Sequence, residues 1–357
     1  MNRQWRVARY PRTDEPIGPA HFDWVEQPVP EPADGEFLVR TLCLAPGPAQ
    51  RGYLSPGHAD FYGTVPVGEV MRGRGVAEVV TSRHPDYAAG DIFVGSLGWQ
   101  DYSVQRPRGA EFVFSNRKIA APSRPLPTTT LGMLGQAGTT AWFGLHEAGG
   151  LRVGDNVLVS AAAGGVGSMA GQIARLKGAG RTVGIAGTAA KCEWLCKVLG
   201  FDAAINYRSD DLAARLRELF PGGIDLFFDN VGGEILNQAL ANLARGARVA
   251  VCGYIASDYA GHKSGPANYH HLVYQRARMQ GFVVFDYWQR FAEAETALMA
   301  WYRAGRLSDC EDMDEGLERM PESLGSLFSG GNRGIRLCRV AADPAHLPLL
   351  ARNLASP

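Results

Sequence analysis

The stretch best suited to chemistry is the glycine-rich segment VLVSAAAGGVGSMAGQIARLKG at residues 157–178. A short apolar run ends near Ser160, and small residues then lead into an amphipathic segment with the spacing of a helix. A strand, a tight turn and a helix N-terminus present bare backbone amides, which suit a dinucleotide pyrophosphate. The backbone groups expected to bind it belong to Gly164, Gly165, Val166 and Gly167. A glycine-rich turn that binds no ligand is the alternative.

The type of dinucleotide depends on a position about twenty residues further along, where NAD sites carry an acid that binds the ribose hydroxyls. Here the second strand runs into VGIAGTAAK, and Gly187 stands in place of the acid. The missing carboxylate leaves space for a 2′-phosphate, and Lys191 and Tyr207 follow. One charge-assisted hydrogen bond from the lysine would favour NADPH about tenfold or more. The sequence therefore predicts NADPH, with an ordinary surface lysine as the alternative for Lys191.

Composition limits the function classes. The 36 basic and 36 acidic residues balance, so no global field attracts nucleic acid or an anionic membrane. The N-terminus lacks the apolar core of a signal peptide, and no apolar run reaches the ~18 residues of a membrane span. Six scattered cysteines do not form the pattern of a secreted disulfide framework. We expect a cytoplasmic protein that binds neither nucleic acid nor membrane.

Two domains are expected from a chain of 357 residues. Residues 1–135 contain short β-rich pieces separated by Gly and Pro, which indicates a barrel or sandwich. Residues 136–309 alternate apolar strands with helices, which indicates an α/β domain with a doubly wound parallel sheet. The tail, 310–357, contains the strand-like GNRGIRLCRVA and is expected to complete the first domain.

A metal site is not expected. Zinc requires three or four converging Cys, His or carboxylate ligands. Cys192 and Cys196 are one helical turn apart without a third ligand nearby, and the pair His270-His271 stands alone. Any polarisation of a carbonyl would then come from hydroxyl or amide groups.

The chain resembles the zinc-independent double-bond reductases of the medium-chain dehydrogenase/reductase superfamily, which include prostaglandin, plant alkenal and bacterial curcumin reductases. The segments that carry the resemblance cover nearly the whole chain: PAQRGYL (48–54), GEVMRGRGVAEVV (68–80), LGWQDYSV (97–104), GMLGQAGTTAWFGL (132–145), SAAAGGVGS (160–168), LGFDAAINY (199–207), FDNVGG (228–233), RMQGFVVFDY (278–287) and SGGNRG (329–334). The sequence departs from the family at Gly47, where an acid is usual, and at Ile335, where a lysine is usual.

The resemblance implies a GroES-like β domain and a Rossmann domain that binds NADPH. In this family Lys191 and Tyr207 would hold the 2′-phosphate, while Asn230 and Asn332 would contact ribose, pyrophosphate or nicotinamide. A plain turn residue is the alternative for each asparagine. The other expected cofactor residues are Cys252, Gly253, Tyr254, Ile255, Ser257, Tyr259, Phe282, Val283 and Val284.

The implied reaction is hydride transfer to the β-carbon of an enone or enal, followed by protonation of the enolate. Tyr259 and Tyr274 are the candidate proton or oxyanion donors, ahead of Tyr53 and Tyr102, and the cofactor ribose is another. Candidate walls of the substrate cleft are Phe61, Tyr62, Trp99 and Tyr287.

Two other functions remain open at this point: an NADPH-dependent quinone reductase of the same superfamily, and an NADPH-binding protein without turnover. The family also implies a homodimer, in which an edge strand at Gly281–Phe285 pairs across a two-fold axis.

Overall fold

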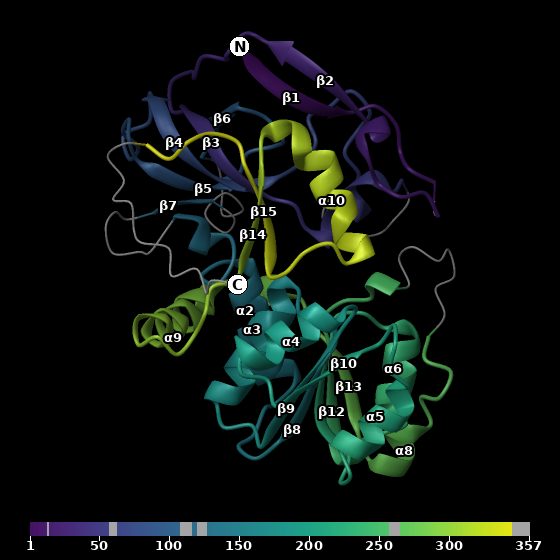
Figure 1. Cartoon of the computed structure of the whole chain (residues 1–357). Helices are drawn as coiled ribbons and strands as arrows, with labels where there is room; N and C mark the ends of the chain where they lie inside the picture. The colour runs from purple at the N-terminus through teal and green to yellow at the C-terminus, as the bar shows by residue number, and fades with distance from the viewer. Residues whose placement is uncertain (13, 57–62, 108–115, 120–126, 257–264, 345–357) are drawn as a thin grey trace. The chain divides into compact units, whose positions relative to one another are not determined.

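The computed structural model describes residues 1–12, 14–56, 63–107, 116–119, 127–256 and 265–344 (Figure 1). The described residues divide into two units, of which the first is drawn from residues 1–131, 312–331 and 336–344. The second comprises residues 132–311 and 332–335. The sequence predicts boundaries at 135/136 and 309/310, with the entire tail in the first domain. The short segment 332–335 groups with the second unit instead, where the Gly334 N–H donates to the Ala163 carbonyl at 2.8 Å.

The first unit is built from antiparallel strands. Strands β1 (Asn2–Val7) and β2 (Phe22–Gln27) form a two-stranded sheet. The larger sheet has the order β14-β15-β3-β4-β5-β7, with β6 also paired to β3. Its strands are β3 (Phe37–Ala45), β4 (Arg74–Ser82), β5 (Ile92–Ser96), β6 (Tyr102–Gln105), β7 (Arg117–Ile119), β14 (Glu311–Glu315) and β15 (Ile335–Arg339). The late strand β15 pairs with β3 through Cys338 and Leu44, so distant parts of the chain form one sheet.

Trp99 belongs to the core of this first unit. Its side chain is fully buried, and its ring lies 4.9 Å from that of Phe22. A Cβ placed on Gly73 would come within 2.6 Å of the Trp99 ring, so the packing around the indole is tight. The expectation that Trp99 lines a substrate cleft is wrong, because no face of the ring is exposed. Phe61 and Tyr62, the neighbouring candidates, lie outside the described residues.

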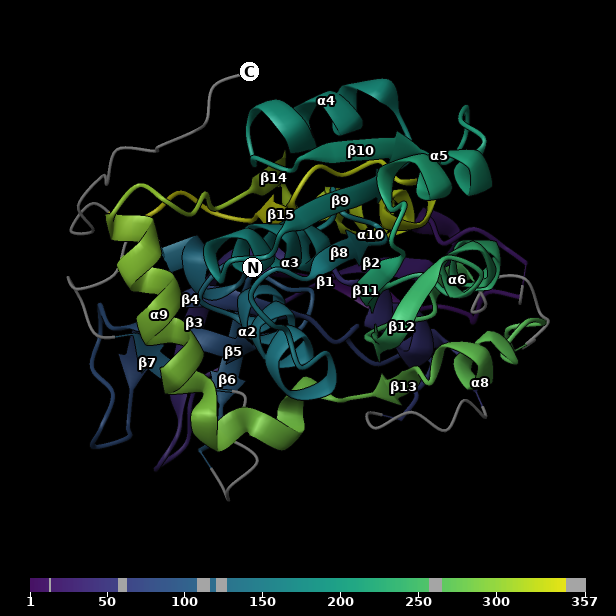
Figure 2. The same ribbon diagram turned by 90° about the horizontal axis from the view of Figure 1, so that it is seen from below.

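The second unit contains a parallel sheet of six strands in the order β10-β9-β8-β11-β12-β13 (Figures 1 and 2). These strands are β8 (Asn156–Val159), β9 (Arg181–Ala186), β10 (Ala203–Asn206), β11 (Ile224–Asp229), β12 (Leu243–Val251) and β13 (Arg278–Gly281). The strand order reverses direction between β8 and β11. Ligands bind at such a reversal in open α/β sheets, outside the carboxyl ends of the strands.

Helices cover both faces of this sheet, which explains why its strands read as continuous apolar runs. Val157 and Val159 pack into one core together with residues of α2 (Gln136–Phe143), α3 (Gly165–Leu176), α4 (Ala189–Lys197) and α9 (Phe291–Arg303). Leu158 points the other way, into a core shared with α5 (Leu212–Leu219) and α6 (Gly233–Leu240). The doubly wound α/β fold predicted from the sequence is confirmed.

The expected edge strand Gly281–Phe285 is wrong in its position. Strand β13 covers Arg278–Gly281, and a 3₁₀ helix, η5, begins at Val284 (Val284–Arg290). The reason is burial: Phe282 packs edge-on against Phe228 at 6.3 Å, and Val284 is almost fully buried. These apolar side chains leave the sheet edge to enter the core. All four residues of β13 itself are exposed.

Candidate functional site

The glycine turn between β8 and α3 is shaped by close backbone contacts. Ala161 has a positive φ of 47°, and the Gly164 N–H donates to the Ala161 carbonyl at 2.9 Å. A Cβ on Gly167 would lie 2.2 Å from that same carbonyl oxygen, so only glycine lets α3 begin this close to the turn. The first N–H groups of a helix have no partner inside the helix, and they can bind an anion.

The segment 332–335 lies against this turn. Gly164 and Gly334 form a parallel bridge, and a Cβ on Gly165 would lie 3.3 Å from the Cα of Ile335. The structure thus brings Asn332 to the glycine turn, although the two are far apart in sequence. The Asn332 side-chain amide donates to the Gly334 carbonyl at 2.7 Å, which holds the segment in its turn.

The other predicted cofactor residues meet along one edge of the sheet. Because all six strands are parallel, the residues that follow them lie at the same, carboxyl edge. Following the strand ends in spatial order gives Tyr207, Gly187, Asn230, Cys252 and Phe282. Ser257 and Tyr259 lie outside the described residues.

A buried hydrogen-bond network holds the turn after β11. The Asp229 carboxylate accepts hydrogen bonds from the Ser160 hydroxyl at 2.9 Å and from the Val231 N–H at 3.0 Å. The Asn230 side-chain amide donates to the Ser160 carbonyl at 2.7 Å. Burial raises the pKa of Asp229, while the hydrogen bonds oppose that effect. Asp229 and Ser160 were missed in the sequence, where the acid ending the apolar run IDLFFD was the available signal.

The turn after β12 packs directly on that network. The Cys252 and Gly253 N–H groups both donate to the Asp229 carbonyl, and a Cβ on Gly253 would approach the Asn230 carbonyl to 3.0 Å. Burial and the neighbouring Asp229 charge raise the pKa of the Cys252 thiol to about 12, which favours the protonated form. Tyr254 is half exposed and Ile255 partly buried.

The corner formed by the ends of β9 and β10 is more open. Thr188 caps helix α4, where its hydroxyl oxygen accepts from the Lys191 N–H at 3.2 Å. A Cβ on Gly187 would lie 3.1 Å from the Tyr207 ring and 3.3 Å from Nε of Arg208. Tyr207 is exposed. Arg208 was missed in the sequence, where the signal was a basic residue directly after the expected Tyr207.

Tyr274 lies at the opposite edge of the sheet. It belongs to α8 (His271–Gln275), which immediately precedes β13, and residues before a parallel strand lie at its amino end. Its side chain is 63% exposed and contacts the ring of His270. This position argues against Tyr274 as a proton donor at the carboxyl edge. Tyr287, a candidate wall residue, stacks on Phe143 with ring centroids 4.9 Å apart.

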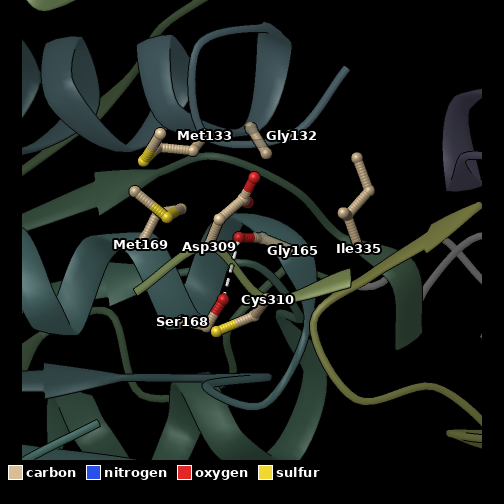
Figure 3. Close-up of a pocket in the computed structure, with 9 residues that line it drawn as sticks. Gly132, Met133, Gly165, Ser168, Met169, Asp309, Cys310 and Ile335 are labelled. Carbon is tan, nitrogen blue, oxygen red and sulfur yellow. Dashed lines mark hydrogen bonds between the residues drawn. The ribbon is translucent and has the colours of Figure 1, made fainter. Parts of the chain in front are cut away.

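Figure 3 shows a narrow pocket behind the glycine turn. Its lining residues are Gly132, Met133, Ala137, Gly165, Ser168, Met169, Asp309, Cys310 and Ile335. It leaves no room for a water molecule, so it is a packing gap and no ligand site. Burial and the neighbouring Glu311 charge raise the pKa of Asp309 well above its ordinary value.

Within the described parts of the chain, no three His, Cys, Asp or Glu side chains gather in a way that would hold a metal ion. Burial raises the pKa of both Cys192 and Cys196, which weakens them as thiolate ligands. Over the same ranges, no helix has the length and apolarity needed to cross a bilayer.

Comparison with known proteins gives two family matches: "Zinc-binding dehydrogenase" over residues 165–301 and "N-terminal domain of oxidoreductase" over residues 3–113. The chain is 36% identical to the NADPH-dependent curcumin reductase of Escherichia coli, over 96% of this chain and 98% of that protein. It is also 36% identical to the NADP⁺-dependent 2-alkenal reductase of Nicotiana tabacum, over 88% and 90% of the two chains.

Among solved structures, CurA from Vibrio vulnificus in complex with NADPH superposes with a TM-score of 0.88. It is 32% identical to this chain, and the match covers 96% of this chain and all of the other. Sequence identity at this level over almost the full length of both chains shows common family membership. The chain therefore belongs to the zinc-independent, NADPH-dependent double-bond reductases of the medium-chain dehydrogenase/reductase superfamily.

Proposed function

We propose that the protein reduces the C=C bond of α,β-unsaturated ketones or aldehydes at the expense of NADPH. The observation that carries the proposal is a nucleotide cradle without an acid at Gly187, in a chain similar over nearly its full length to curcumin and alkenal reductases. Bound NADPH supplies a hydride to the β-carbon of the substrate. The protein then has to hold the cofactor, exclude water and deliver a proton to the enolate.

The backbone cradle fits such a cofactor. The N–H groups of Gly165, Val166 and Gly167 open helix α3 and would bind the pyrophosphate, because the close approach of Gly167 to Ala161 fixes the start of the helix. Lys191 and Tyr207 would hold the 2′-phosphate beside Gly187. The three atoms that would lie nearest a Cβ on Gly187 belong to Tyr207 and Arg208, and none of them is a carboxylate oxygen, which agrees with a phosphorylated ribose.

The carboxyl edge supplies the remaining cofactor contacts. Asn230 presents its polar side chain from the turn after β11, and Asn332 presents its side chain from the segment that precedes β15. The other proposed contacts are backbone or side-chain groups of Cys252, Gly253, Tyr254, Ile255, Ser257, Phe282, Val283 and Val284. Phe282 and Val284 point into the core, so their contribution comes from the backbone.

Tyr259 is the proposed donor to the enolate, and Tyr274 is not retained because it lies at the amino edge of the sheet. A preplaced donor for the developing oxyanion contributes about 2.7–4 kcal/mol to the transition state. The Tyr259→Phe variant should therefore lose about 100-fold or more in kcat while its dissociation constant for NADPH is unchanged. Unchanged turnover would assign the proton to the cofactor ribose or to water.

The experiment that tests the reaction is an assay of NADPH oxidation with enones, enals and simple quinones, with product analysis by mass spectrometry. We expect saturated ketones or aldehydes, two hydrogens heavier than the substrates. Turnover of quinones alone would establish the quinone reductase instead. Tight NADPH binding with no oxidation by any acceptor would identify a protein without turnover.

The assembly and cellular location complete the proposal. Strand β13 stands last in the order of the described sheet and all four of its residues are exposed, which supports pairing with a second copy of the chain in a homodimer. All six cysteines are free thiols, which suits the reducing cytoplasm. Analytical ultracentrifugation tests the dimer, and a charge or proline placed at exposed Gln280 should convert it to a monomer.

A further inference from the structure

The corner at the ends of β9 and β10 contains one cation beyond the proposed Lys191. Arg208 directly follows Tyr207 and is exposed. Its guanidinium carbon lies 5.7 Å from the centroid of the Tyr207 ring, and its Nε–H donates to the Tyr207 hydroxyl at 3.3 Å. The aromatic ring and the hydroxyl together hold the guanidinium at this corner.

The Arg208 guanidinium lies close to Gly187, the position that distinguishes NAD sites from NADPH sites. A Cβ on Gly187 would be 3.3 Å from Nε of Arg208 and 3.3 Å from the Tyr207 hydroxyl oxygen. The arginine therefore lies over the position that an NAD-specific site gives to its ribose-binding carboxylate. NAD-specific sites have a negative charge at this position, whereas this chain has a positive one.

Two nearby carboxylates have other roles. Asp210 accepts from the Asn206 N–H at 2.9 Å and from the Ser209 hydroxyl at 2.9 Å. Asp211 caps helix α5, where it accepts from the Ala214 N–H at 3.0 Å. Both acids are held by the local backbone of the turn after β10, and their hydrogen bonds order the loop that carries Arg208.

We propose that Arg208 is a second cation of the 2′-phosphate site and that it acts with Lys191 to select NADPH over NADH. The inference rests on the proposed cofactor site and adds a specificity-determining residue to it. A phosphate monoester carries nearly two negative charges at neutral pH, so one lysine leaves it only partly neutralised. The planar guanidinium adds paired donors to phosphate oxygens, whereas the lysine ammonium acts as a point charge.

The test compares binding of NADP⁺ and NAD⁺ by titration calorimetry, since the two differ only in the 2′-phosphate. Arg208→Ala should weaken NADP⁺ binding about tenfold or more and leave NAD⁺ within about twofold. The NADP⁺ affinity of Arg208→Lys should lie between that of Arg208→Ala and that of the wild type. Arg217→Ala is the matched control, because Arg217 is an exposed arginine near the end of α5, which leads to the amino end of β11. It should leave both affinities unchanged.

A second readout separates contact with the phosphate from support of the loop. In ³¹P NMR of bound NADP⁺, loss of a neighbouring cation should raise the pKa of the 2′-phosphate by about 1. Unchanged NADP⁺ affinity in Arg208→Ala, or an equal loss of affinity for NADP⁺ and NAD⁺, would overturn the inference. The proposed role of Lys191 at the 2′-phosphate would be unaffected. If the wild type bound NADP⁺ and NAD⁺ equally, the proposed NADPH site itself would fail.

Discussion

The glycine turn after β8 and the open corner after β9 both belong to the proposed cofactor site, yet they are built in opposite ways. The glycine turn is made of backbone in contact with backbone, with Gly167 against Ala161 and a buried Asp229 network beside it. The corner is made of exposed side chains, Tyr207 and Arg208, over a bare Gly187. Changes at the turn should therefore damage the fold and all binding, whereas changes at the corner should alter only the choice between coenzymes.

The largest effect is expected for Gly167→Ala. The added Cβ would lie 2.2 Å from the Ala161 carbonyl oxygen, so the start of α3 must shift. A displacement of this kind typically costs about 100-fold in catalysis, and overpacking costs about 1–3 kcal/mol of stability. Steady-state kinetics with each coenzyme and thermal unfolding measure both effects.

The matched control for that variant is Gly164→Ala, where the nearest atom to a Cβ would be 3.3 Å away and φ is negative. It should lose less activity and less stability than Gly167→Ala, because its added Cβ approaches the Ala161 carbonyl oxygen less closely. Equal loss in the two variants would show that the close approach at 167 has no special importance.

A smaller and more selective effect is expected for Lys191→Ala. Loss of one charge-assisted hydrogen bond should raise KM for NADPH about tenfold or more, with KM for NADH nearly constant. Lys197→Ala is the control, because Lys197 lies on the same helix and pairs with exposed Glu193. Equal increases in KM for the two coenzymes would show that Lys191 does not bind the 2′-phosphate.

A pH-dependent effect on stability is expected from Asp309, the buried acid behind the glycine turn. Its pKa is raised in the folded protein, so the folded state binds more protons than the unfolded chain above pH ~4. Stability should then fall as the pH rises through that elevated pKa. Asp309→Asn removes the titrating group, and urea unfolding at pH 5 and pH 8 should show a weaker decline for the variant. If the stability of the variant declined as steeply with pH as that of the wild type, a group other than Asp309 would cause the pH dependence.

The smallest effect is expected for Tyr274→Phe. Tyr274 is exposed and lies at the amino edge of the sheet, away from the glycine turn. Turnover and NADPH affinity should both stay within about twofold of the wild type, as is usual for surface substitutions. A large loss of kcat would show that the catalytic groups are not confined to the carboxyl edge of the sheet.

Much of the second unit could be predicted because its signals are local. Apolar runs such as IDLFFD mark β11, and the glycines at 164, 165 and 167 mark the turn before α3. The corner was found from an absent acid at Gly187. The strand at 281–285 was misjudged because apolar β-branched residues suit a strand and a buried turn equally well, and only packing against Phe228 decides between them.

Other features depend on contacts between distant residues, which a single sequence does not reveal. Trp99 looked like a cleft residue until its burial against Phe22 was known. Tyr274 is a candidate in the sequence because a metal-free site needs a hydroxyl donor, and only the parallel direction of β13 shows that this tyrosine lies at the amino edge of the sheet. Arg208 was overlooked because its importance comes from lying over Gly187, twenty-one residues earlier in the chain.

The central claim is that Gly187 and the cations around it select a phosphorylated ribose. The most direct measurement is the ratio of the dissociation constants of NADH and NADPH for the unmodified protein, determined by titration calorimetry in one buffer. The account predicts that NADPH binds at least about tenfold more tightly. Equal affinity for the two coenzymes would contradict it.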